Sequence, residues 1–229
     1  YSFMFAYCNM IAAFCFGWLN QSLLRYYGFL SKSQSLRETI IVATVGLVVI
    51  ASTLMFILHW LNISKQTSKY LTIICTLAIA LFGLVKTYLQ AKMQPNRVVW
   101  ITIIQSVLAI SLSILFVLLI KPTHTVMIIS IIIAYLVAAL SFLKKSTLIK
   151  MNKNWFQLSA KVKKNIAMFF KFGWPLSFYY VTALALPFFD RYFIKHFLSL
   201  EQLGAYSGFQ ELIGKIFALV LFPVTMAVH

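Results

Sequence analysis

The segment TIIVATVGLVVIASTLMFILHWL, residues 39–61, is 23 residues long and contains no Asp, Glu, Lys or Arg. About 20 apolar residues in a helix cross the hydrocarbon core of a bilayer, which is roughly 30 Å thick. The run is too long for a β-strand, and it lacks the alternation of a membrane barrel. This segment therefore predicts a transmembrane helix.

Six further segments pass the same test of length and apolar composition. Together they predict an all-α protein, a polytopic bundle of about seven transmembrane helices. The expected helices are Tyr1–Leu24, Thr39–Leu61, Tyr70–Gln90, Val98–Ile120, Thr123–Leu143, Phe172–Phe189 and Leu203–Val228.

The composition of the chain excludes a soluble globular protein. Of its 229 residues, 62% are hydrophobic and 10% are charged, whereas a soluble domain is about 45–50% apolar and about 25% charged. Too few polar side chains remain to cover a surface that faces water.

The chain is also strongly basic, with 20 Lys and Arg against 4 Asp and Glu and a net charge of +16. Most of these cations lie between the apolar segments, so orientation in the membrane explains them better than binding to nucleic acid. Alternate loops carry 14 and 5 of them when Lys86 is counted with its adjacent loop. The more basic set of loops should face the cytoplasm.

Residues 150–171 are basic, and their apolar residues follow helical spacing, which predicts an amphipathic cytoplasmic linker. We expect this linker to separate two parts of the chain. Residues 1–149 would form the first part, with five transmembrane helices, and residues 172–229 would start the second part, with two.

Polar and charged side chains within the apolar segments, or at their ends, are candidates for ligand binding, because a charge at mid-bilayer costs about 2.5–3.5 kcal/mol. Cations outnumber anions at these places, which favours an anionic ligand such as a phosphate-bearing lipid. The candidate substrate-binding residues are Arg25, Lys86, Lys215, Glu211, Asn20 and Gln21.

Several charged residues also have a structural explanation. Lys86 is close enough to the cytoplasmic end of its helix to reach the headgroups. Glu211 and Lys215 are four residues apart and could form a neutral pair on one helix. Asp190 and Arg191, at the external end of a span, are expected to form a structural pair.

Three of the predicted helices carry stripes of small and polar residues at helical spacing. Such stripes let two helices approach closely, or they line a polar cavity. We expect them to line the substrate cavity. The stripes are Asn9, Ala13, Gly17 and Gln21; Thr76, Ala80, Gly83, Thr87 and Gln90; and Ser207, Glu211, Gly214 and Ala218.

No residue pattern indicates catalysis or metal binding. The four carboxylates include no close pair, the four histidines are far apart, and there is no glycine-rich phosphate loop. We therefore expect no catalytic residues, no cofactor and no metal. Cys8, Cys15 and Cys75 all fall in apolar segments and are expected to be packing residues.

The strongest resemblance to a known family lies in FGWPLSFYYVTALALPFFDRYFIKHFLSLEQLGAYSGFQELIGKIFALVLFPVTMAV, residues 172–228. It resembles the start of the second lobe in polysaccharide (O-antigen type) flippases of the multidrug/oligosaccharidyl-lipid/polysaccharide exporter superfamily. The shared features are Gly173 and Pro175, Asp190 and Arg191, the element Leu203, Gly204, Tyr206 and Ser207, and Pro223. WLNQSLLRYYG (residues 18–28) and LQAKMQPNRVVWITIIQSVLAI (residues 89–110) are similar, more weakly, to earlier helices of that family.

The resemblance implies a fragment of a two-lobed transporter of twelve or more transmembrane helices, in which residues 1–149 are an incomplete first lobe and residues 172–229 the start of the second lobe. Such a transporter flips undecaprenyl diphosphate-linked oligosaccharides by alternating access. It would act in the bacterial cytoplasmic (inner) membrane, in the synthesis of O-antigen, lipopolysaccharide or another surface polysaccharide. Its partners would be this lipid-linked substrate, membrane lipids and other polysaccharide-assembly proteins. The alternatives are a cation-coupled small-molecule or multidrug exporter of the same superfamily, and a non-transporting glycan-assembly protein such as a polymerase.

Two local features are expected within the stretch that carries the resemblance. Pro175 should lie in the first turn of its helix, where the missing N–H matters least. Ser199 and Gln202 have the spacing of a capping box, which predicts the start of the last helix.

Overall fold

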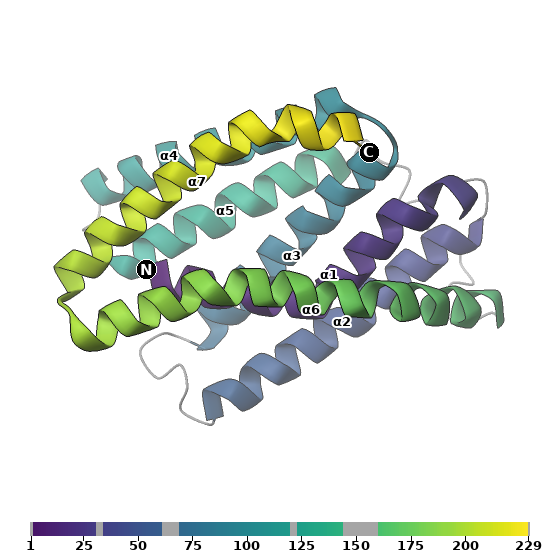
Figure 1. The fold of residues 1–229 in the computed structure, drawn as a ribbon, viewed down its shortest axis with the longest axis horizontal. Coiled ribbons are helices and arrows are strands. Elements are labelled where there is room, and N and C mark those ends of the chain that lie inside the picture. The colour runs from purple at the N-terminus through teal and green to yellow at the C-terminus, as the bar shows by residue number, and fades with distance from the viewer. Residues whose placement is uncertain (1, 31–33, 61–68, 120–122, 144–159, 229) are drawn as a thin grey trace.

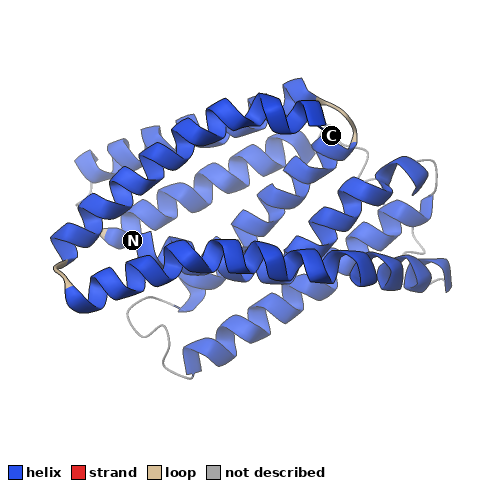
Figure 2. Cartoon of the chain, in the orientation of Figure 1, coloured by secondary structure: helices blue, strands red, loops and turns tan. Residues whose placement is uncertain are grey.

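The computed structural model describes residues 2–30, 34–60, 69–119, 123–143 and 160–228. Within these ranges the chain forms seven α-helices and no strand (Figures 1 and 2), which confirms the predicted all-α fold. The helices are α1 (Ser2–Leu30), α2 (Gln34–Trp60), α3 (Lys69–Ala91), α4 (Pro95–Leu119), α5 (His124–Leu143), α6 (Ala160–Phe197) and α7 (Leu200–Val228).

Five of the described helices, α2 to α6, are long and apolar enough to cross a membrane. Their candidate spans are Ser35–Trp60, Tyr70–Ala91, Pro95–Leu119, Thr125–Phe142 and Ala160–Ile194. The two other expected spans fall in α1 and α7, which are not among the five. Each of these helices has 29 residues, a length of about 44 Å at 1.5 Å per residue.

α1 forms the centre of the bundle, because it packs against α2, α3 and α6. Its buried side chains run from Met4 to Leu23 and share one hydrophobic core with residues of α2, α3 and α5 and with Phe169 of α6. α4 and α5 pack on α3 through a second core that includes Phe82 and Val98. A central helix of this kind presents different faces to different neighbours.

α1 and α6 approach each other closely where they cross, because small residues occupy the crossing. Gly173 of α6 lies directly against the Trp18 carbonyl group of α1, and a Cβ atom at this position would overlap that oxygen. One turn away, the Ser22 hydroxyl donates a hydrogen bond of 2.5 Å to the Phe169 carbonyl oxygen. Lipid is as apolar as the side chains themselves, so burying apolar side chains between helices does not favour association. Small residues and interhelical hydrogen bonds hold the helices together instead.

The capping box predicted at the start of the last helix is confirmed. The Gln202 N–H donates to Ser199 Oγ at 3.2 Å, and the Ser199 N–H donates to Gln202 Oε1 at 3.1 Å. These two bonds satisfy N–H groups that a helix start leaves without partners. They fix the point at which the chain turns from α6 into α7.

α6 begins earlier than the sequence predicts. It starts at Ala160 and continues unbroken through Lys171 and Phe172, where we expected the border between linker and span. Pro175 therefore lies in the interior of α6, and its predicted place in a first turn is wrong. With 38 residues, α6 is about 57 Å long, more than the membrane core needs. The rest of the predicted linker, residues 150–159, lies outside the described residues.

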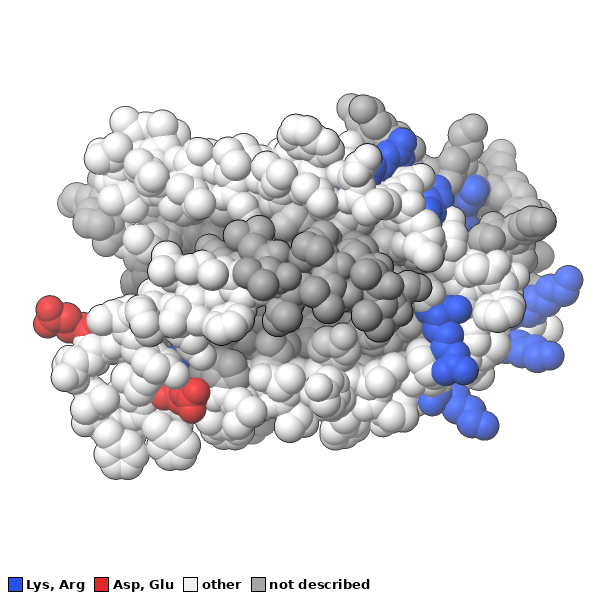
Figure 3. Space-filling model, turned by 45° about the horizontal axis from the view of Figure 1, so that its top comes forward, with Lys and Arg blue, Asp and Glu red and all other residues white. Residues whose placement is uncertain are grey.

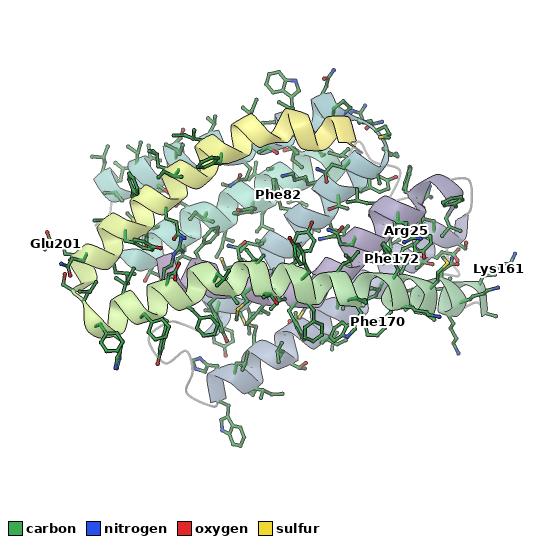
Figure 4. All side chains as sticks on the ribbon, viewed as in Figure 1. Arg25, Phe82, Lys161, Phe170, Phe172 and Glu201 are labelled. Atoms are coloured by element: carbon green, nitrogen blue, oxygen red, sulfur yellow. The ribbon has the colours of Figure 1, made fainter. Side chains whose placement is uncertain are left out.

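Charge is separated along the length of the bundle. On the face shown in Figure 3, the Lys and Arg side chains gather mainly at one end, and the visible Asp and Glu side chains lie toward the other. Figure 4 places Arg25 and Lys161 at the first end and Glu201 at the second. We call the first, which also includes the exposed Lys163 and Lys164, the basic end. Its charge agrees with a cytoplasmic position.

Replacing Gly173 with alanine should force α1 and α6 apart. The new methyl group would overlap the Trp18 carbonyl oxygen, and overpacking of this kind costs about 1–3 kcal/mol. The thermal unfolding temperature of the purified protein in detergent should therefore fall. Gly46→Ala in α2 is the matched control, because nothing lies within 4 Å of its added Cβ. Equal unfolding temperatures for the two variants would contradict the close crossing.

Candidate functional site

Asn20, a predicted substrate-binding residue, points from α1 toward α3. Its Nδ2 atom lies 3.7 Å from the position that a Cβ on Gly83 would take. The Oδ1 atom is buried and has no hydrogen-bond partner in the described chain. Burying an unpaired polar group costs about 1–3 kcal/mol, so each such group in a folded protein needs an explanation. A ligand that contacts the amide would supply one.

Lys86 lies on the same side of α3 as Gly83. It follows Gly83 by three residues, which places it about 4.5 Å further along the helix axis. Its side chain is half-buried, and within the described ranges no residue forms a hydrogen bond or ion pair with its ammonium group. A partly buried cation without a counter-charge is costly, and a bound anion would reduce that cost. We call Asn20, Gly83 and Lys86 the α1–α3 polar site.

Some members of the stripes of small residues on α1 and α3 pack between helices. Gly17 faces Ser177 of α6, whose Oγ lies 3.0 Å from the position of an added Cβ. On α3, Thr76 and Ala80 are only 1% and 4% exposed, and the Thr76 hydroxyl donates to a carbonyl of its own helix. Close helix packing therefore takes up Gly17, Thr76 and Ala80. That the stripes line a substrate cavity stays a prediction.

Arg25 is not brought together with the α1–α3 polar site. Its guanidinium carbon lies 4.2 Å from the centroid of the Phe172 ring of α6 and 5.7 Å from that of Tyr26. These are cation–π contacts at the basic end of the α1–α6 crossing. Asn20 lies five residues earlier, about 7.5 Å away along the axis of α1. Gln21 is half-buried on α1 next to Asn20.

The remaining predicted residues lie on α6 and α7. Glu211 and Lys215 fall in α7, but their side chains lie outside the described residues, so their pairing stays a prediction. Asp190 accepts a hydrogen bond of 3.2 Å from the Tyr206 hydroxyl, which joins α6 to α7. Arg191 is buried, with 6% of its surface exposed. Its pairing with Asp190 also stays a prediction.

The sequence analysis did not predict the hydrogen bond from the Tyr206 hydroxyl to Asp190, which joins α6 to α7. In the sequence Tyr206 belongs to the element Leu203, Gly204, Tyr206 and Ser207, 16 positions after Asp190, and nothing in that spacing marks a contact between the two. The one usable signal was the capping box between the two residues. A sharp turn at Ser199 brings the end of α6 next to the first turns of α7.

The three cysteines are buried and free, which confirms the prediction that they are packing residues. The Cys8 thiol of α1 donates a hydrogen bond of 3.7 Å to the Thr72 carbonyl oxygen of α3. Among the described residues, no three His, Cys, Asp or Glu side chains gather closely enough to hold a metal ion.

Comparison with known proteins adds one finding. A family model described as polysaccharide biosynthesis protein matches residues 1–229, which is the whole chain. No curated protein and no solved structure shows significant similarity to it. Together with the five helices able to cross a membrane, the match identifies a multi-pass membrane protein.

Replacing Asn20 with leucine should not destabilise the protein. The substitution removes a buried amide oxygen that has no partner, so we expect an unfolding temperature in detergent equal to or above that of the parent. Asn9→Leu on the same helix is the control, because Asn9 Nδ2 donates a 2.9 Å hydrogen bond to the Phe5 carbonyl. If only Asn20→Leu lowered the unfolding temperature, the amide would have a structural role and the site assignment would fail.

Proposed function

The chain belongs to the polysaccharide biosynthesis protein family, and on that premise we propose that it is a flippase for lipid-linked oligosaccharides. The transported unit would be an oligosaccharide on undecaprenyl diphosphate. It would cross the bacterial cytoplasmic (inner) membrane by alternating access between two helical lobes, for the synthesis of a surface polysaccharide. The family match and the membrane-spanning helices support this proposal.

The observation that carries the proposal is the half-buried Lys86 without a described counter-charge, one helical turn from Gly83, which Asn20 of α1 faces with its buried, unpartnered Oδ1 atom. A lysine ammonium group is a compact charge with three donors, which suits a phosphate oxygen. The Asn20 amide can donate to a phosphate or accept from a sugar hydroxyl. The diphosphate would bind between α1 and α3 while its lipid tail stays in the bilayer.

A cation-coupled exporter of small molecules has less support. Such a transporter would carry carboxylates within its spans as ion sites. Of the carboxylates whose side chains are described, Glu38 lies near the start of α2 and Glu201 near the start of α7. Asp190, near the end of α6, accepts a hydrogen bond from Tyr206. The cationic α1–α3 polar site favours an anionic substrate.

The proposal assigns no catalytic step to the chain. The α1–α3 polar site combines a cation, an amide and a glycine, and it lacks the nucleophile and base that group transfer needs. The protein would bind and release the substrate without making or breaking a covalent bond. Other polysaccharide-assembly proteins would deliver the lipid-linked unit and remove it.

Replacing Lys86 with glutamine should strongly reduce surface glycan. A hydrogen bond to a charged group contributes about 1.5–3 kcal/mol, so we expect export to fall by about tenfold or more. Lys86→Arg keeps the charge and should retain most of the activity. The measurement is surface polysaccharide in cells whose own copy is deleted, with variants matched for amount in the membrane.

The matched control is Lys164→Gln, at an exposed position of the basic end. It should leave export unchanged, because it removes an equal charge away from the polar site. Full export by the Lys86→Gln variant would contradict the assignment of the site.

A further inference from the structure

The first half of α6 carries two neighbouring rows of side chains on its surface. Residues four apart in a helix lie one above the other on the same face. The rows are Lys163, Ala167 and Lys171, which we call the basic row, and Phe170, Trp174 and Phe178, which we call the ring row. Trp174 is half-buried, and the other five side chains are exposed. The basic row lies nearer the start of α6, and the ring row continues from it toward the middle of the helix.

The ring row is held in place by α1. Trp174 lies between the two other rings, with centroids 5.2 Å from that of Phe170 and 5.2 Å from that of Phe178. Phe14 of α1 meets Trp174 at 5.5 Å, and Trp18 of α1 meets Phe170 at 5.4 Å. Phe170 and Phe178 nevertheless remain 46% and 53% exposed. The row is therefore an apolar ridge with one side fixed against α1 and the other side open.

The basic row lies on the side of α6 that faces away from α2. Asn165 Nδ2 donates hydrogen bonds of 3.3 Å each to the side-chain oxygens of Ser35 and Thr39, which fixes the first turns of α6 on α2. Lys163 and Lys171 point away from this contact and are exposed. Among the described residues, neither ammonium group has a hydrogen-bond or ion-pair partner.

Two features place Lys171 where the hydrocarbon core meets the headgroups. The 18 residues between Lys171 and Asp190 include no charged residue, and this separation is about 28 Å along a helix, close to the roughly 30 Å of the core. Pro175 also has no N–H, so the Lys171 carbonyl loses its partner in the helix. An unpaired carbonyl is costly in hydrocarbon, whereas the headgroup layer offers it donors. Since the basic end is cytoplasmic, the basic row lies in the cytoplasmic headgroup layer.

A lipid on this face of α6 is distinct from the proposed transport substrate. Trp18 and Ser22 of α1 face α6, and Asn20 lies midway between them on the opposite face of α1, toward α3. A lipid with its diphosphate at the α1–α3 polar site would therefore have α1 between its headgroup and the ring row. The cytoplasmic leaflet itself is rich in anionic lipids, whose charge is complementary to the basic row.

We propose that the two rows of α6 bind an anionic phospholipid of the cytoplasmic leaflet. Its phosphate lies beside Ala167, whose small side chain leaves room between the lysines. Lys163 and Lys171 are each four residues away, about 6 Å along the axis, within reach of their long side chains. One acyl chain follows the ring row into the core. This site does not depend on what the protein transports.

Trp174 can report on the site because it lies in the ring row. In the complete protein every other tryptophan is replaced by phenylalanine, and the protein is placed in phosphatidylcholine bilayers. Phosphatidylglycerol with brominated acyl chains is then added, because bromine quenches tryptophan fluorescence on contact. Each lysine near the surface should favour the anionic lipid by about fivefold. We therefore expect a preference of at least about tenfold over brominated phosphatidylcholine.

The test variant is Lys163→Gln/Lys171→Gln, for which the two brominated lipids should quench Trp174 equally. The matched control is Lys92→Gln/Arg97→Gln, which removes the same charge near the turn between α3 and α4, away from α6. It should keep the full preference. Equal quenching by both lipids in the parent would overturn the site. So would a preference that both variants lose or both retain.

The other possible occupant is the polyprenyl carrier lipid. Unlabelled undecaprenyl phosphate should displace brominated phosphatidylglycerol from Trp174 no better than unlabelled phosphatidylglycerol does. Stronger displacement would assign the face to the carrier lipid and overturn the phospholipid site. If the single-tryptophan protein does not fold, the unfolding temperature of the parent in phosphatidylcholine nanodiscs, with and without phosphatidylglycerol, replaces the quenching. An increase that is absent in the parent, or that persists in Lys163→Gln/Lys171→Gln, would also overturn the site.

Discussion

The structure depends on the contact between the backbones of α1 and α6 at Gly173, Trp18 and Ser22. Lipid solvates apolar side chains as well as another helix does, so neighbouring helices need close packing and hydrogen bonds to stay together. Gly173 permits that approach because it has no Cβ, and Ser22 adds a hydrogen bond to a carbonyl of α6. This contact holds α1 in the centre and turns its opposite face, with Asn20, toward α3.

The two faces of α1 have different roles: one packs against α6, and the other carries the polar group that we assign to substrate binding. One face is filled by α6 and leaves no space for a ligand, while the other carries a polar group that no described residue satisfies. Lys86 on α3 adds a half-buried positive charge on the side of that helix that faces Asn20. Unsatisfied polar groups and uncompensated charges lower stability, so their presence in a membrane bundle favours a functional explanation.

The sequence predicts much of the fold, because membrane helices are specified by length and composition. The uncharged run at residues 39–61 corresponds to α2 with small shifts at both ends, and the capping box at Ser199 follows directly from its spacing. The true start of α6 could not be predicted, because basic residues before Lys171 suit both an interfacial helix and an extended end of a span. That Gly17 and Ala80 pack closely between helices could not be predicted either, because small residues serve close packing and cavity lining equally well. Asn20 and Lys86 were identified from their polarity alone, whereas the fold had to show that they lie on facing helices.

The central claim is that this protein carries an anionic lipid-linked oligosaccharide across a bilayer. The most direct measurement is the rate at which an undecaprenyl diphosphate oligosaccharide crosses the membrane of liposomes that contain the complete purified protein. The account predicts transfer at least about tenfold faster than in protein-free liposomes, a decrease of more than about 1.4 kcal/mol in the barrier. Equal rates in the two kinds of liposome, with the protein shown to be folded and correctly inserted, would contradict it.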